Sequence, residues 1–268
     1  MFWEWLGSSP QAPTILAFHG FGGSGQDFEP VAKALDRLGL NWIAPHAHRF
    51  ASRDFENEVS SSMREAFLLS IHEKVKASGV RRPIVMGYSM GGRIALQYAL
   101  KYKEFIRGLI LVGTTPGISS ANLMLERRQM EAAWIQKIKD EGVVAFQSYW
   151  QTLPVMASQA RIPREVREAI RKRRRAVLPS ELIFSLKSFG QGFFPPLWEA
   201  VSQLDIPTLL VAGANDEKYC KLAQAMQKYL QRGHVERIPH AGHAAHLENT
   251  PLFANCCEKF INRLVSEK

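Results

Sequence analysis

The sequence predicts an α/β fold in which helices flank a mostly parallel sheet. Short apolar runs alternate with helical patterns at both ends of the chain, and strand patterns stop between about residues 116 and 200. Near-continuous apolar strands are typical of parallel sheets, because helices bury both faces of such sheets. The middle stretch predicts a helical cap, inserted after a strand that ends near Gly113. We therefore expect a core of residues 1–115 and 201–268 and a cap of residues 116–200.

The first half of the core is predicted to alternate strands and helices. Strands are expected where apolar runs precede Gly, Pro or a polar turn, over residues 14–18, 41–45, 83–87 and 109–113. Helices are expected where apolar residues recur at helical spacing, over residues 28–38, 57–78 and 91–102.

The second half of the core repeats this order after the cap. Strands are expected over residues 208–213 and 235–238, and helices over residues 221–230 and 252–265. The Trp-rich start of the chain is expected to pack against an edge of the sheet. Strand–helix units on both sides of the cap predict that one sheet is built from both halves of the core.

Composition excludes several classes of protein. The 268 residues are 46% hydrophobic and 22% charged, which is ordinary for folded globular proteins. Three cysteines, two of them adjacent, cannot form a disulfide framework and lack zinc-binding spacing, so we expect no metal site. The sequence has no run of about 20 apolar residues and no basic signal-peptide start. These observations predict a cytoplasmic protein that does not interact with a membrane.

The net charge of +9 is concentrated in one segment. Residues 161–175 hold eight basic side chains, seven of them Arg, against two acidic ones. No aromatic residue interleaves this run, so nucleic acid is not an expected partner. The run is interpreted as a solvated helix face or as a source of cations for an anionic small-molecule substrate.

The pattern G-x-S-x-G occurs at residues 87–91, between an apolar strand and an amphipathic helix. Glycines on both sides of Ser89 permit a sharp turn that exposes its hydroxyl at the end of the strand, beside a helix N-terminus. A packing turn of small residues is the alternative. The strand–turn–helix setting favours Ser89 as a reactive residue.

A serine of this kind needs an imidazole to take its proton and a carboxylate to orient the imidazole. Asp216 and His243 each follow one of the last two predicted strands. The order Ser, Asp, His along the chain is the order that accompanies this serine turn. We predict a catalytic triad of Ser89, Asp216 and His243. Neighbouring side chains remain alternatives for the acid or the base: Glu217, His240 and His246.

Residues 19–23, His-Gly-Phe-Gly-Gly, follow the first predicted strand. They could form a simple tight turn. The functional interpretation is an oxyanion hole, in which the backbone N–H groups of Phe21 and Met90 converge beside Ser89. His19 is interpreted as a residue that stabilises the turn.

Together these motifs resemble the α/β-hydrolase superfamily, from Thr14 to the final predicted helix. The resemblance implies that fold but no particular reaction, because the fold supports esterases, C–C hydrolases, haloperoxidases and lyases. Arg93 lies four residues after Ser89, on the same helix side and about 6 Å further along the axis. It could be an ordinary surface arginine, but a cation at this place suits a substrate carboxylate.

Further residues are similar to one family of this superfamily, the 2-succinyl-6-hydroxy-2,4-cyclohexadiene-1-carboxylate synthases, lyases of menaquinone and phylloquinone biosynthesis. The residues that carry this resemblance are 19–22, 87–93, 126–128, 185–187, 190–192, 196–198, 216–219 and 241–249. Members bind substrate through three arginines, which map by motif position onto Arg93, Arg127 and Arg174. The run over residues 171–175 leaves Arg173 and Arg175 as alternatives for the third arginine.

The resemblance implies a cofactor-free elimination. The substrate, 2-succinyl-5-enolpyruvyl-6-hydroxy-3-cyclohexene-1-carboxylate, has three carboxylates, the triad serine removes a ring proton, and pyruvate leaves. An arginine-rich pocket suits such a polycarboxylate. The same triad under a different cap would hydrolyse a small anionic ester or a C–C bond, which is the alternative. The oligomeric state is left open.

Overall fold

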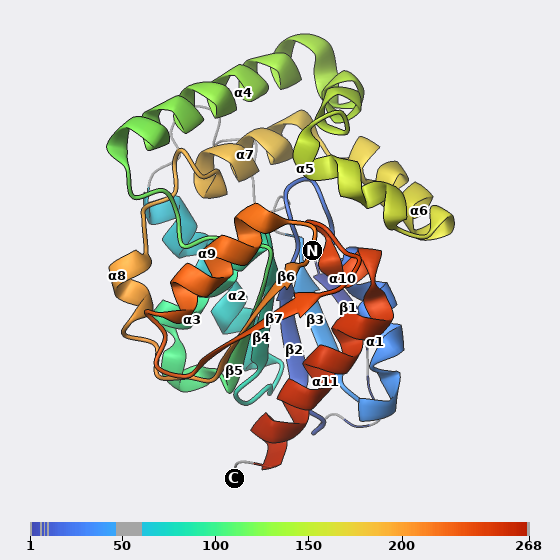
Figure 1. The fold of residues 1–268 in the computed structure, drawn as a ribbon, viewed down its shortest axis with the longest axis vertical. Helices are drawn as coiled ribbons and strands as arrows, with labels where there is room; N and C mark the ends of the chain where they lie inside the picture. Colours follow the sequence, from blue (N-terminus) through green and yellow to red (C-terminus); the bar gives the residue numbers. More distant parts are fainter. Residues whose placement is uncertain (1, 6, 8, 10, 47–60, 267–268) are drawn as a thin grey trace.

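The central element of the protein is a twisted sheet (Figure 1). A computed structural model describes all residues except 1, 6, 8, 10, 47–60 and 267–268. In this part of the chain seven strands form one sheet of order β1-β3-β2-β4-β5-β6-β7. Their bounds are Phe2–Trp5 (β1), Thr14–Phe18 (β2), Asn41–Pro45 (β3), Ile84–Tyr88 (β4), Gly108–Val112 (β5), Thr208–Gly213 (β6) and Gly233–Ile238 (β7). Neighbouring strands are parallel, except that β1 pairs with β3 in the antiparallel direction.

Helices bury both faces of this sheet, and side chains alternate between the two faces along each strand. In β2, Ile15 and Ala17 pack on the side of α1 (Glu29–Ala34) and α11 (Thr250–Ser266). Leu16 and Phe18 pack on the other side. The helices on that side include α2 (Ser61–Ala77), α3 (Met90–Lys101) and α9 (Glu217–Gln227). Two apolar layers thus hold the strands in register, as the continuous apolar runs predict.

The segment between β5 and β6 is helical wherever the chain forms regular structure. It contains α4 (Ala121–Trp150), α5 (Pro154–Ala157), the 3-10 helix η5 (Ser158–Arg161), α6 (Arg164–Arg175), α7 (Pro179–Phe189) and α8 (Trp198–Val201). Helices α4 to α7 lie above the carboxyl ends of the strands (Figure 1). They have an apolar cluster of their own, which includes Trp134, Phe146 and Leu182. We propose that residues 116–200 form the cap. Its boundaries with the core, at residues 115 and 200, stay a prediction.

Most of the predicted strands and helices are present, and the differences have local causes. The N-terminal residues do more than pack on the sheet edge, because β1 adds a strand to it. The predicted helix over residues 28–38 breaks after Ala34 and continues as a short 3-10 helix, Asp36–Leu38, which stops at the following Gly39, where φ is 60°. The helix predicted from residue 221 begins at Glu217, because the Asp216 side chain caps it by accepting the Tyr219 N–H. The predicted start of α2 at residues 57–60 lies outside the described residues.

All three cysteines are free of disulfides. Among the described helices, none is long and apolar enough to cross a membrane.

Candidate active site

A cavity of about 720 Å³ lies between the carboxyl ends of the strands and the cap. Strands β2 and β4 are neighbours at the middle of the sheet, and the chain leaves them toward opposite edges. In open α/β sheets, ligands bind in the crevice at such a switch point. The turns after β2 and β4 contribute Phe21 and Ser89 to the lining, and α4 contributes Arg127 and Trp150 from above.

Ser89 occupies the turn between β4 and α3 in an unusual backbone conformation, with φ 52° and ψ −111°. Such a conformation persists only where the surroundings fix it. A Cβ on Gly87 would lie 2.3 Å from the Gly91 carbonyl oxygen, and one on Gly91 would lie 2.0 Å from that of Phe18. The Ser89 N–H also donates to the Val112 oxygen at 2.8 Å. The two glycines of the motif are therefore needed for close packing around the serine.

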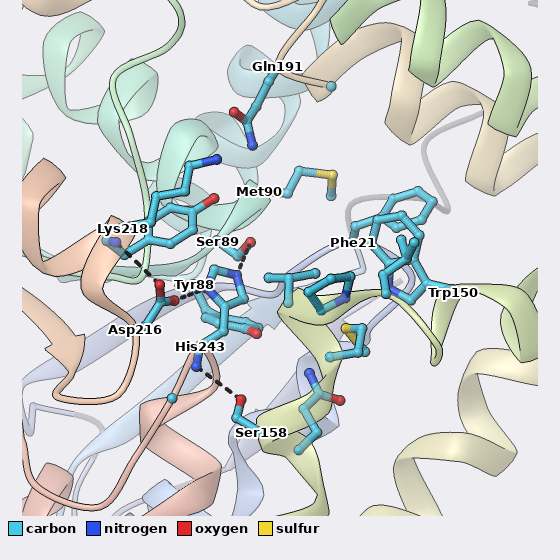
Figure 2. A pocket seen from close by; sticks show the side chains of 18 of the residues that line it. Phe21, Tyr88, Ser89, Met90, Trp150, Ser158, Gln191, Asp216, Lys218 and His243 are labelled. Atoms are coloured by element: carbon cyan, nitrogen blue, oxygen red, sulfur yellow. Dashed lines mark hydrogen bonds and ion pairs between the residues drawn. The ribbon is translucent and has the colours of Figure 1, made fainter.

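Ser89, His243 and Asp216 form a hydrogen-bonded line, as Figure 2 shows. The Ser89 Oγ lies 3.0 Å from His243 Nε2, and His243 Nδ1 lies 2.9 Å from Asp216 Oδ2. A carboxylate at Nδ1 keeps the proton there and directs the Nε2 lone pair at the serine. The structure thus brings together the three residues that the sequence predicts as a triad.

The alternative acid and bases are not part of this hydrogen-bonded line, although Glu217 also lines the cavity. Glu217 is exposed and faces Lys221, with 3.9 Å between the charged atoms. His240 is exposed at a positive φ of 58°. His246 is buried against Tyr88 and Phe28, and burial lowers its pKa to about 3, so it stays neutral. None of these side chains hydrogen-bonds to Ser89 or Asp216 in the described part of the chain.

Phe21 and Met90, the predicted oxyanion-hole residues, both line the cavity. Met90 is the first residue of α3, so its N–H has no acceptor within the helix and lies at the positive end of the helix dipole. The Phe21 ring packs edge-on against Trp150 of the cap, with 4.9 Å between centroids (Figure 2). His19 is buried, and its Nδ1 lies 2.8 Å from the Gly20 oxygen within the same turn. The arrangement is compatible with an oxyanion hole, whose role stays a prediction.

Arg93 lines the cavity and is almost completely buried. Its Nε and Nη2 donate to the Phe189 carbonyl at the end of α7, at 3.0 and 2.6 Å. Burial lowers the pKa of Arg93 to about 10, which still leaves it charged at neutral pH. The helical spacing predicts its place near Ser89, but the anchoring by Phe189 could not be foreseen, because it depends on how α7 packs.

Arg127 also lines the cavity and is held by a buried carboxylate, Glu131. The Arg127 Nε lies 2.7 Å from Glu131 Oε1, and its guanidinium carbon lies 4.8 Å from the Trp134 ring centroid. Glu131 also accepts the N–H groups of Gln191 and Gly192, each at 2.9 Å. Sequence reasoning missed Glu131, although its spacing of four residues from Arg127 is the signal of a helical ion pair.

The structure distinguishes the three arginines at the end of α6. Arg174 is buried, lines the cavity and donates from Nη1 to Gln159 Oε1 at 3.2 Å. Arg173 points away from the cavity toward Asp27, which lies in the segment after β2, and its Nη2 is 2.8 Å from Asp27 Oδ1. Arg175 is exposed. Helix phase therefore gives Arg174 to the cavity, in agreement with the motif position.

Other lining residues had no functional assignment from the sequence. They include Trp150, Ser158, Gln159, Gln191, Lys218 and Tyr219. Burial raises the pKa of the Tyr219 hydroxyl, so this residue stays neutral beside Arg93 and Arg127. Within the described residues, no group of three or more His, Cys, Asp or Glu side chains could hold a metal ion.

This fold, the serine turn and the triad geometry define a class of protein. Residues 13–250 match the family model of the alpha/beta hydrolase fold, and the chain belongs to that family. A Bacillus subtilis (strain 168) protein, provisionally named 2-succinyl-6-hydroxy-2,4-cyclohexadiene-1-carboxylate synthase, is 32% identical over 93% of this chain and 90% of its own. A Yersinia pestis (strain Nepal516) protein named as the same synthase is 28% identical over 90% and 85% of the two chains. The structure of MenH from S. aureus matches with a TM-score of 0.87 and 25% identity, over 98% of each chain. Within the hydrolase class, the chain is therefore a member of this synthase family.

Proposed function

We propose that this protein is a lyase that eliminates pyruvate from 2-succinyl-5-enolpyruvyl-6-hydroxy-3-cyclohexene-1-carboxylate to give 2-succinyl-6-hydroxy-2,4-cyclohexadiene-1-carboxylate. The observation that carries the proposal is that one cavity holds both a hydrogen-bonded Ser89–His243–Asp216 line and three arginines. The names of the relatives supply the reaction, and the cavity supplies groups that suit it.

The three arginines are proposed to bind the substrate carboxylates. Arg93, Arg127 and Arg174 enter the cavity from α3, α4 and α6, so they can contact a ligand from three sides. Each already has one fixed contact, to Phe189, Glu131 or Gln159, which limits the rotamers it can adopt. A guanidinium held in place in this way loses less side-chain entropy when it binds a carboxylate.

Ser89 is proposed to remove a proton from the substrate ring. As its Oγ takes that proton, its own hydroxyl proton passes to His243 Nε2, and Asp216 stabilises the resulting imidazolium. The electron pair of the broken C–H bond forms a new ring double bond, while the C–O bond to the enolpyruvyl group breaks and its electron pair leaves on that oxygen. The released pyruvate enolate takes up one proton and becomes pyruvate, and His243 gives up the proton it gained, so the triad returns to its starting state. The N–H groups of Phe21 and Met90, which both line the cavity, are proposed to stabilise negative charge on an oxygen near Ser89.

The direct test is release of pyruvate from the proposed substrate, measured with lactate dehydrogenase and NADH. We expect release by the purified wild type and near-complete loss in Ser89→Ala. Arg175→Gln, which changes an exposed arginine of the same helix, is the control and should keep the wild-type rate.

A different outcome would favour the hydrolase alternative. Consumption of the substrate or of an anionic ester with incorporation of water oxygen, and without pyruvate release, would contradict the lyase proposal. A small-molecule substrate and the absence of a nucleic-acid partner are common to both possibilities. The cytoplasmic location stays a prediction.

A further inference from the structure

The loop that carries His243 is held by one carboxylate. Glu248, at the end of the short helix α10 (Ala245–Glu248), accepts the N–H of Gly242 at 2.6 Å and that of Ala244 at 3.0 Å. These are the two residues that flank His243. These residues lie in the loop between β7 and α10, so their N–H groups have no acceptor within a strand or a helix. The Glu248 carboxylate is their acceptor instead.

A serine of the cap completes this arrangement. Ser158, the first residue of η5, donates its hydroxyl to Glu248 Oε1 at 2.7 Å and accepts the His243 N–H at 3.2 Å. In Figure 2, Ser158 and Ser89 lie on opposite sides of His243. The three consecutive N–H groups of residues 242–244 are thus held by Glu248, directly or through Ser158. Ser158 is 85 residues away from His243 in the sequence, so this contact links the cap to the triad.

The contact between η5 and the loop is close. A Cβ on Gly242 would lie 2.3 Å from the Ser158 Cβ, so only glycine allows this approach. The next residue of η5, Gln159, accepts the hydrogen bond from Arg174. Two adjacent residues of η5 therefore contact the histidine loop and an arginine that lines the cavity.

We propose that Ser158 and Glu248 are positioning residues for His243. Through η5, the position of the cap on the core and the position of Arg174 in the cavity are coupled to the orientation of the catalytic imidazole. The inference rests on the proposed role of the triad, but it holds for a lyase or a hydrolase. Catalytic side chains work only when neighbouring contacts hold them within about 0.5 Å of the productive geometry. When η5 leaves the loop, the His243 N–H loses its acceptor and Glu248 loses a donor, so the Asp216 contact alone orients the imidazole toward Ser89.

The test uses Ser89 itself as the reporter, so it does not depend on the natural substrate. An alkyl phosphonofluoridate phosphonylates an activated serine: the Ser89 Oγ displaces fluoride, and His243 takes the hydroxyl proton. We expect Ser158→Ala and Glu248→Gln each to lower the second-order labelling rate by about tenfold, while unfolding of the whole protein stays cooperative. Ser148→Ala and Glu141→Gln are the matched controls, because both side chains are exposed on α4 and make only local contacts.

A positioning role also predicts coupling and a change in pH dependence. The double variant of Ser158 and Glu248 should label no more slowly than the slower single variant, because both changes open the same network. Gln159→Ala should slow labelling about threefold and should add nothing to Ser158→Ala. In both Ser158→Ala and Gln159→Ala, the midpoint of the labelling rate against pH should move, whereas the controls keep the wild-type midpoint.

Two results would overturn the inference. One is wild-type labelling and an unchanged pH midpoint in Ser158→Ala; this variant removes only one oxygen, so it remains informative if Glu248→Gln does not fold. The other is simple additivity of the Ser158 and Glu248 effects. Absence of pyruvate release with normal labelling in the wild type would reject the proposed reaction and leave this inference untouched.

Discussion

Glu131→Gln should measure how much one buried carboxylate in the cavity wall contributes to the free energy of unfolding and to substrate binding. Helix α4 has two acid–base pairs four residues apart, Arg127–Glu131 and Lys137–Glu141. They differ in their surroundings: the Glu131 side chain is fully buried, and that of Glu141 is 49% exposed. The same substitution at both positions therefore compares a buried pair with an exposed one.

The magnitude follows from the three groups that donate to Glu131. A glutamine keeps one carbonyl oxygen, which can still accept from Arg127 and Gln191 on the Oε1 side. Its amide NH₂ then faces the Gly192 N–H and leaves that buried donor unsatisfied, which costs about 1–3 kcal/mol. The two remaining hydrogen bonds lose their charged acceptor, at about 1 kcal/mol each. We expect Glu131→Gln to lower the free energy of unfolding by about 3–5 kcal/mol, and Glu141→Gln by at most about 0.5 kcal/mol.

Urea unfolding followed by tryptophan fluorescence measures both values, provided that the slope of free energy against urea stays unchanged. The pyruvate assay adds a second measurement, because a neutral acceptor holds Arg127 less firmly than the Glu131 carboxylate does, which should raise KM. Equal destabilisation by the two substitutions, with KM unchanged in both, would refute the assignment of Glu131 as the anchor of this wall.

Three further substitutions test other parts of the site. Asp216→Asn should keep the fold, as seen by circular dichroism, and lower kcat by about 10³–10⁴-fold, because the imidazole tautomer is no longer fixed. A smaller loss of kcat in Asp216→Asn than in Glu217→Gln would show that Asp216 is not the acid of the triad. Arg174→Gln should raise KM by about 30-fold, as expected for a lost charge-assisted contact; a KM as low as that of the exposed-site variant Arg175→Gln would contradict this. The pKa of His246 is about 3 in the fold and 6.5 in the free side chain, so the unfolded chain binds more protons between these values. Stability should therefore fall as pH falls from 6.5, by up to about 1.4 kcal/mol per pH unit from this residue. His246→Phe should reduce the difference in urea midpoint between pH 7 and pH 5, and an unchanged difference would show that His246 is not the source.

Features that depend on a few neighbouring residues could be predicted from the amino-acid sequence alone. The apolar runs of β2, β4, β5 and β6 identify buried parallel strands, because a strand covered on both faces needs apolar side chains at every position. The turn at Ser89 could be predicted from the G-x-S-x-G pattern between a strand and a helix. The structure then shows why residues 87 and 91 are glycines, since a Cβ at either would clash with a backbone oxygen. The places of Asp216 and His243 followed from their strands, since parallel strands end at the same edge of the sheet.

The side chains that meet across the cavity could not be predicted in this way, because they come from distant parts of the chain. Three adjacent arginines on α6 have the same local sequence signal, and the packing of that helix assigns Arg173 to Asp27 and Arg174 to the cavity. The roles of Glu131 and Ser158 likewise depend on groups at least 60 residues away, such as Gln191 and His243. Hydrogen-bond partners of this kind depend on how the cap packs on the ends of the strands. The local periodicity of the sequence carries no information about that packing. For this reason the sequence predicted the reactive residues, and only the structure showed what holds them in place.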